Sequence, residues 1–185
     1  MSSLIEQTKP EADILDVCCG SRMFYDNENK DRMDIIYMDI RKDVTIEYTQ
    51  KNGTTSVWKV DPDIVGDFRH IPFEDNRFSL VIFDPPHLFK AGKGIITNKY
   101  GSLSTNWKKD IEKGFKECMR VLRPGGFLNF KWSETEIPLA EISPLFPCRP
   151  LYYQRRTTKK SSGYWAMFRK ESSISKEQKT LEVFF

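Results

Sequence analysis

The chain has 185 residues, 39% hydrophobic and 30% charged, and its formal net charge is only +3. This length can bury one substantial core but is too short for two ordinary domains. We therefore expect a single domain over residues 1–185, with its core at about 13–170. No apolar run approaches the roughly 20 residues of a membrane span, and the first residues lack the pattern of a secretory signal. We expect a cytoplasmic protein that does not contact a membrane.

Four cysteines stand at positions 18, 19, 118 and 148. Their spacing is not that of paired zinc-binding motifs, and their density is far below that of a small disulfide-stapled domain. We interpret them as reduced, structural residues and expect no metal.

Four short apolar runs in the first half each contain or lead to an aspartate and are typical of buried strands. They span residues 14–18, 34–38, 64–67 and 80–84. Asp39 follows the second run and lies 23 residues after Asp16 (39 − 16). That separation fits a strand, a crossover helix and a second parallel strand.

The remaining patterns predict two hairpins, two helices and a further strand. Residues 44–48 and 57–60 alternate in polarity around Asn52-Gly53, which indicates a small inserted hairpin near 43–60. Apolar residues recur at helical spacing over 107–122, 127–132 is strand-like, 134–142 predicts a short helix, and 152–156 with 164–169 predicts a final hairpin. This order predicts an α/β fold whose mostly parallel sheet has one antiparallel addition.

The segment from Ile14 to Arg22, ILDVCCGSR, resembles the first motif of class I S-adenosylmethionine-dependent methyltransferases. In that family the first strand ends in an acidic residue followed by a glycine-rich turn, although here only Gly20 of the usual three glycines is present. The similarity covers about residues 13–170. It implies a Rossmann-like, doubly wound sheet of seven strands and S-adenosylmethionine as cofactor. Asp16 would receive the amino group of its methionine part, with Cys18 and Gly20 in the cofactor turn.

Two more segments extend the resemblance. Asp39 stands where the family has an acidic residue that accepts hydrogen bonds from both ribose hydroxyls, although a solvated aspartate at a strand end is the plain alternative. Residues 66–78 resemble the family's third motif, which implies that Asp67 meets the adenine amino group and that the backbone of Phe68 flanks the ring.

Asp84-Pro85-Pro86-His87 resembles the (Asp or Asn)-Pro-Pro-aromatic motif of methyltransferases that act on amino groups conjugated to a ring or carbonyl. The lone pair of such a nitrogen is delocalised, so the site must accept its hydrogens as it attacks the methyl group. The Asp84 carboxylate and the Pro85 carbonyl can be those acceptors, and the two prolines stiffen the loop. The resemblance implies that Asp84, Pro85, Pro86 and His87 are catalytic, with Asp84 also beside the cofactor.

The fourth residue of this motif departs from the family, because histidine replaces tyrosine, phenylalanine or tryptophan. Imidazole can still stack on a base, but the change weakens the argument for adenine as target. Phe89 could supply a second ring surface or could belong to the core.

A cluster of basic residues near the C-terminus bears on the kind of molecule that the protein binds. Residues 149–170 contain seven basic side chains and no acidic one, interleaved with aromatic rings. Such a pattern suits single-stranded or flipped-base nucleic acid, and a hairpin with buried rings and solvated charges is an equal alternative. We assign Arg155 and Arg156 to substrate binding. The resemblance implies the same role for Lys99 and Tyr100, which stand in the segment where this family builds substrate contacts, and a solvated lysine-rich loop is an equal alternative for that segment.

Short phage and prophage methyltransferases resemble the chain especially closely. The leading hypothesis is methyl transfer to an exocyclic amino nitrogen of a nucleic-acid base, in DNA or RNA, with adenine N6 favoured. Two alternatives stay open: a methyltransferase that acts on a protein amide or small molecule, and a non-catalytic binding module of the same fold. A partner subunit for target recognition would reconcile the short chain with a nucleic-acid substrate.

Overall fold

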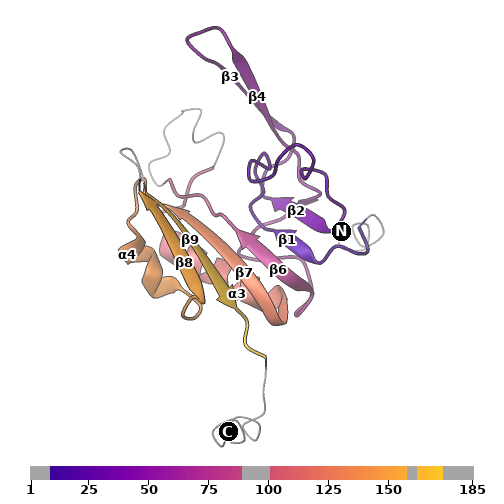
Figure 1. The fold of residues 1–185 in the computed structure, drawn as a ribbon, viewed down its shortest axis with the longest axis vertical. Coiled ribbons are helices and arrows are strands. Elements are labelled where there is room, and N and C mark those ends of the chain that lie inside the picture. The colour runs from indigo at the N-terminus through magenta and orange to yellow at the C-terminus, as the bar shows by residue number, and fades with distance from the viewer. Residues whose placement is uncertain (1–8, 89–100, 158–161, 173–185) are drawn as a thin grey trace, which may run out of the picture.

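The computed structural model describes residues 9–88, 101–157 and 162–172, and a seven-stranded sheet forms its centre (Figure 1). The strand order is β5 (Ile64–Val65), β2 (Ile35–Asp39), β1 (Ile14–Asp16), β6 (Phe78–Phe83), β7 (Leu122–Ser133), β9 (Ser162–Arg169) and β8 (Tyr152–Thr157). The first five are mutually parallel, whereas β9 runs antiparallel to both β7 and β8. The predicted mostly parallel sheet with an antiparallel C-terminal hairpin is confirmed.

Helix α3 (Trp107–Val121) covers one face of the sheet. Its apolar side chains recur at helical spacing and are buried, among them Ile111, Phe115 and Cys118. Because side chains alternate across a strand, the same face receives Val81 and Phe83 from β6 and Leu128, Phe130 and Trp132 from β7. This face contains the main hydrophobic core.

The opposite face near β1 and β2 has a different cover. Residues 17–34 form turns, so the predicted crossover helix is wrong. Side-chain contacts replace it: Arg22 donates to the Lys30 carbonyl and the Asp61 carbonyl, each at 2.7–2.8 Å, and its guanidinium lies 4.1 Å from the centre of the Tyr37 ring. The segment is rich in Asp and Asn, which favour turns over helix interiors.

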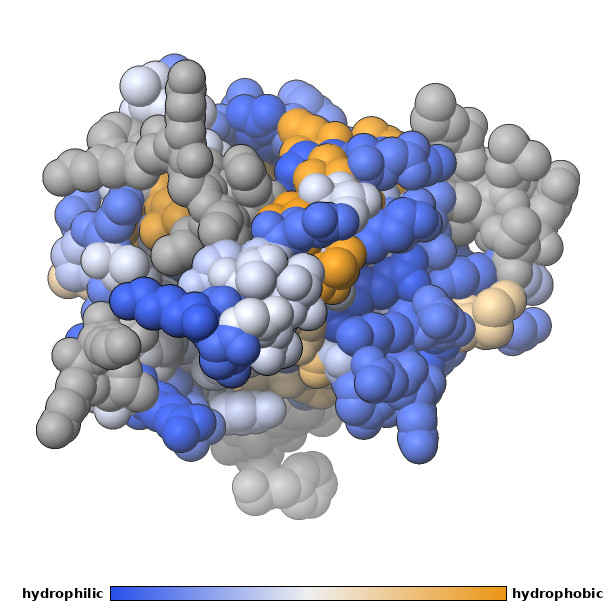
Figure 2. Space-filling model, turned by 90° about the horizontal axis from the view of Figure 1, so that it is seen from above, coloured by the Kyte–Doolittle hydropathy of each residue, from blue (hydrophilic) through white to orange (hydrophobic). Residues whose placement is uncertain are grey.

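The inserted hairpin is confirmed. Strands β3 (Val44–Thr49) and β4 (Thr55–Val60) pair in antiparallel register, from Val44 opposite Val60 to Thr49 opposite Thr55. Gly53 has the positive φ of 82° that this turn requires. The hairpin protrudes from the body of the molecule (Figure 1), and the surface seen from that end is mostly hydrophilic, with small separate hydrophobic patches (Figure 2).

The short helix predicted over 134–142 is only partly present. Helix α4 (Leu139–Ile142) begins after Pro138, and the 3-10 turn η1 (Ser143–Leu145) follows it. A residue before proline is disfavoured in helical conformation, which explains why the helix does not extend back to Ile137. In the described part of the chain, no helix has the length and apolarity needed to cross a membrane.

Candidate active site

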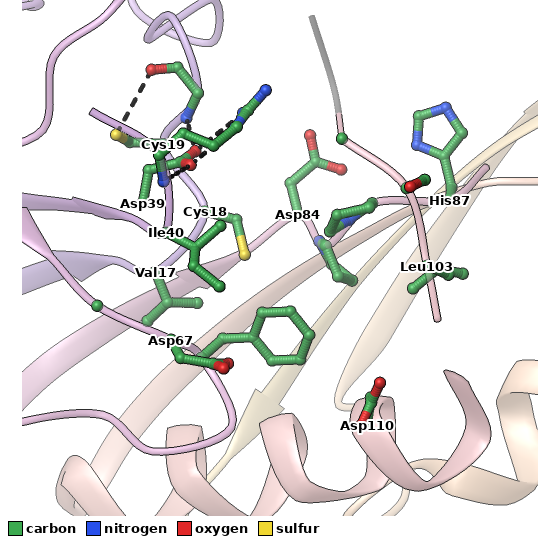
Figure 3. Close-up of a pocket in the computed structure, with 18 of the residues that line it drawn as sticks. Val17, Cys18, Cys19, Asp39, Ile40, Asp67, Asp84, His87, Leu103 and Asp110 are labelled. Atoms are coloured by element: carbon green, nitrogen blue, oxygen red, sulfur yellow. Dashed lines mark hydrogen bonds and ion pairs between the residues drawn. The ribbon is translucent and has the colours of Figure 1, made fainter. Parts of the chain in front are cut away.

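A cavity of about 590 Å³ opens at the carboxyl ends of the parallel strands, where the segments after β1, β2, β5 and β6 meet (Figure 3). The strand order reverses between β1 and β6, and open α/β sheets bind ligands at such a switch point. Most of the predicted cofactor and catalytic residues line this cavity: Cys18, Gly20, Asp39, Asp67, Phe68, Asp84, Pro85, Pro86 and His87.

Asp16 is placed differently, since it is not among the described residues that line the cavity. The residue is 1% exposed, and its carboxylate accepts hydrogen bonds from the Tyr25 hydroxyl at 3.0 Å and from the Cys18 N–H at 3.2 Å. Burial raises the pKa of Asp16 to about 7, and the Asp84 and Asp39 carboxylates add to that rise. Its role at the methionine amino group stays a prediction.

Asp39 ends β2 and faces the cavity with a carboxylate that already has several donors. Gly20 N–H donates at 3.0 Å, from a backbone with φ of 51°. Arg41 donates from its backbone N–H at 2.9 Å, from Nε at 3.0 Å and from Nη2 at 3.1 Å. Two hydroxyls that bind Asp39 would therefore replace the side-chain donors of Arg41.

Asp67 is held in a similar way by an arginine. Arg69 Nη2 lies 2.6 Å from one Asp67 oxygen, and Nη1 lies 3.3 Å from Asp110 at the start of α3. Burial would raise the pKa of Asp67, but the hydrogen bonds from Arg69 outweigh it, so the pKa is lowered. Next to Asp67, the Phe68 ring packs 5.4 Å from the Phe83 ring. Asp110 also lines the cavity, and it belongs to none of the motifs from which site residues were predicted.

Asp84 follows β6 and carries the most distinctive feature of the cavity. Lys131 Nζ lies 2.8 Å from Asp84 Oδ2. The other oxygen, Oδ1, is buried and has no hydrogen-bond partner within the described residues. Burial raises the pKa of the carboxyl, while the Lys131 ammonium opposes that rise. A buried acceptor without a donor is costly and rare, so Asp84 Oδ1 marks a place for a ligand N–H or O–H.

His87 also lines the cavity, and Asp84 lies between it and Asp39 in the close-up view (Figure 3). Its ring centre is 6.5 Å from that of Trp132, in an edge-to-face arrangement. Burial, with the nearby Lys131 charge, lowers the pKa of His87 to about 4. The imidazole is therefore neutral at neutral pH and presents an uncharged ring to the cavity.

Lys131 is a site residue that sequence reasoning missed. Phe83 pairs with Phe130 in parallel register, which places the next residues, Asp84 and Lys131, side by side. On the antiparallel side, Lys131 pairs with Trp165 of β9. Its position inside a central strand, among apolar neighbours, was the available signal.

The residues predicted for substrate binding lie outside the cavity or outside the described structure. Arg155 and Arg156 are exposed on the edge strand β8, and Arg155 pairs with Glu134 at 2.8 Å. Phe89, Lys99 and Tyr100 fall outside the described residues. Among the residues that are described, no group of three or more His, Cys, Asp or Glu side chains could hold a metal ion.

Solved structures share this fold at low sequence identity. A SAM-dependent methyltransferase from Methanosarcina mazei has a TM-score of 0.53 at 14% identity, covering 92% of this chain and 98% of that one. The N-methyltransferase NodS from Bradyrhizobium japonicum has a TM-score of 0.54 at 10% identity, covering 92% and 94%. Another NodS structure contains S-adenosyl-L-homocysteine. No family model and no curated protein matches the sequence.

These likenesses establish the architecture as the Rossmann-like fold of S-adenosylmethionine-dependent methyltransferases. The same fold also occurs in the [4+2]-cyclase SpnF, with a TM-score of 0.53 at 12% identity over 93% of this chain and 80% of that one. Since one fold serves different reactions, the reaction must be argued from the residues of the cavity.

Proposed function

We propose that the protein transfers a methyl group from S-adenosylmethionine to an exocyclic amino nitrogen of a nucleic-acid base, with adenine N6 favoured. The observation that carries the proposal is the buried Asp84 Oδ1, which lacks a donor among the described residues and belongs to an Asp-Pro-Pro-His segment that lines the cavity. An amino group supplies such a donor.

The cavity residues fit S-adenosylmethionine. The volume of about 590 Å³ lies within the usual range for a cofactor-sized ligand. Asp39 would hold the ribose hydroxyls and Asp67 with Phe68 the adenine, as the family resemblance implies. The side chains of Asp39, Asp67 and Asp84 line the cavity, and their carboxylates also suit a cationic ligand. The cofactor supplies an electrophilic methyl group on a sulfonium.

The Asp-Pro-Pro-His segment would hold the acceptor. Asp84 Oδ1 accepts one amino hydrogen and the Pro85 carbonyl accepts the other, which keeps the nitrogen lone pair free to react. The neutral imidazole of His87 offers a ring for stacking on the acceptor. Because both prolines restrict the backbone, these groups are preorganised.

The hairpin of β8 and β9, which carries basic residues of the 149–170 segment, supports a nucleic-acid acceptor. Arg155 and Arg156 are exposed on β8, next to Tyr152 and Tyr153, which are 63% and 64% exposed. Exposed rings and cations together suit single-stranded nucleic acid. Replacing both arginines by alanine should weaken binding of a single-stranded oligonucleotide and flatten its salt dependence. Unchanged binding and salt dependence would remove this hairpin from the acceptor site.

Two other functions have specific support. The likeness to NodS, an N-methyltransferase, supports transfer to a nitrogen without favouring a nucleic-acid base, so a protein amide or a small molecule is a second candidate acceptor. A partner subunit that recognises the target would be consistent with a nucleic-acid acceptor. The glycine-poor turn after β1 favours a non-catalytic binding module, but Asp84 Oδ1, which has no hydrogen-bond partner in the described part of the chain, argues for a bound acceptor.

Two variants test the proposal by separating binding from transfer. Asp39→Ala should abolish S-adenosylmethionine binding measured by calorimetry. Asp84→Ala should keep that binding but lose transfer of a labelled methyl group by at least about 100-fold, a typical loss when one preorganised polar contact is removed. Full binding by Asp39→Ala together with full transfer by Asp84→Ala would contradict the site assignment.

A further inference from the structure

We propose that Lys131 is a specificity-determining residue, whose ammonium group makes the acceptor end of the cavity select a neutral amino group and reject a cationic amine. This inference rests on the proposed function and narrows its acceptor class. It concerns a residue outside the Asp-Pro-Pro-His segment.

The fold puts Lys131 and Asp84 on the same face of the sheet. Side chains alternate along β7, so Phe130 and Trp132 enter the core under α3 while Lys131 points to the other face. Asp84 follows the buried Phe83 and also points away from that core. Both side chains line the cavity.

Aromatic rings fix the ammonium group beside the carboxylate. Lys131 Nζ lies 4.6 Å from the centre of the Phe24 ring and 5.8 Å from the centre of the Trp165 ring. These two rings contact each other, with centres 5.1 Å apart. The Lys131 side chain is 23% exposed and that of Asp84 16%. Cation–π contacts and partial burial therefore keep the positive charge at Asp84 and out of bulk water.

This arrangement determines which donor can reach the remaining oxygen. Lys131 already neutralises the carboxylate through Oδ2, and Oδ1 is left as an acceptor. A neutral amino group, conjugated to a ring or carbonyl, can donate to Oδ1 without adding charge. A protonated amine at Oδ1 would place a second cation on the same carboxylate, within reach of Lys131, and like charges at such separations repel strongly.

A matched pair of fragments tests the inference without requiring methyl transfer. Aniline carries a neutral amino group at neutral pH, whereas benzylamine of similar size is cationic. Their dissociation constants would be measured by calorimetry on the full chain saturated with S-adenosylhomocysteine. We expect the wild-type protein to bind aniline at least about tenfold more tightly than benzylamine, the lower end of the effect of a neighbouring charge.

Variants separate charge from shape. Lys131→Met and Lys131→Gln should each lose most of the preference for aniline, because both remove the charge and the glutamine keeps a hydrogen-bond donor. Lys131→Arg should keep the preference. Lys116→Met, which removes an exposed lysine on α3, should leave the preference unchanged. Thermal unfolding of each variant checks that it is folded. Two neutral variants are used so that the test still works if one of them fails to fold.

Two results would overturn the inference: equal affinity of the wild-type protein for both fragments, or an unchanged preference in the neutral variants. Failure of the proposed function is distinguishable, since it would appear as no binding of S-adenosylhomocysteine in the same calorimeter before any fragment is added.

Discussion

The Tyr25 hydroxyl donates a hydrogen bond to Asp16 at 3.0 Å and joins the turn segment after β1 to the end of that strand. The Tyr25 ring packs edge-on against Tyr37 of β2, with centres 5.2 Å apart. A small cluster containing Cys19 and Ile35 surrounds these rings. The contact therefore substitutes for the packing that a crossover helix would provide, and it leaves a carboxyl group in a buried position.

Asp16 should make the stability of the protein depend on pH. Because burial raises its pKa from 3.8 to about 7, the folded state holds a proton that the unfolded state has released between about pH 4 and pH 7. Stability attributable to Asp16 therefore falls as pH rises through that window. Asp16→Asn should gain stability over the wild-type protein between pH 5 and pH 7, on the order of 2 kcal/mol.

Urea unfolding of both proteins at the two pH values measures this difference. His87 has a lowered pKa of about 4, which makes stability rise with pH in the same range. Its contribution is the same in both proteins and cancels in the comparison. A difference between the two proteins that does not change with pH would contradict the assignment to Asp16.

Arg41 should compete with the cofactor for Asp39. Its side chain contributes two donors to that carboxylate, and ribose hydroxyls need the same acceptors. Arg41→Ala should therefore bind S-adenosylmethionine at least as tightly as the wild-type protein, measured by calorimetry, while Asp39→Ala loses binding. Equal losses in the two variants would instead make Arg41 a direct cofactor ligand.

His87 should act as an uncharged ring. Because its pKa is about 4, kcat/KM should show no inflection from His87 between pH 6 and pH 8. His87→Phe should retain activity, and His87→Ala should raise KM by about tenfold, since stacking on a base contributes about 1–3 kcal/mol. Steady-state kinetics on the nucleic-acid acceptor give both values. An inflection near neutral pH that disappears in His87→Phe would show a charged role instead.

Gly114 of α3 should be intolerant of a side chain. A Cβ there would lie 2.7 Å from Phe68 Cδ2 and 2.7 Å from Phe83 Cζ. Phe83 is fully buried, so the strain falls on Phe68, which lines the cavity. Gly114→Ala should destabilise the protein by about 1–3 kcal/mol and weaken cofactor binding.

Thermal unfolding and calorimetry check both effects of that substitution. The matched control is Gly163→Ala, because a Cβ at Gly163 meets no atom of the described residues within 4 Å. If Gly114→Ala were as stable as this control, the close packing of α3 on Phe68 would not be a constraint.

Apolar patterning was enough to predict the sheet. Runs such as 34–38 and 80–84 form buried or half-buried strands of a parallel sheet, and the spacing of residues 107–122 matches α3. The crossover helix after Asp16 was expected from the usual way of joining parallel strands. It failed because the contacts of Arg22 and Tyr25 hold the segment as turns, and those contacts depend on tertiary structure.

The candidate site was predictable where local motifs carry it. Asp39 ends its strand and Asp67 and Asp84 follow theirs, so strand order alone brings the three aspartates to one edge of the sheet. Lys131 was missed because its neighbours depend on the register between β6, β7 and β9. The arginines on Asp39 and Asp67 were missed because hydrogen bonds between side chains leave no periodic signal.

The most direct measurement is transfer of labelled methyl from S-adenosylmethionine. The full chain would be incubated separately with duplex DNA, single-stranded DNA, transfer RNA and bulk protein, and the labelled polymer would then be digested to identify the modified unit. Asp84→Ala serves as the inactive control. We expect label on an exocyclic amino nitrogen of a base, with adenine N6 first. Cofactor binding without label in any nucleic acid would contradict the proposed acceptor.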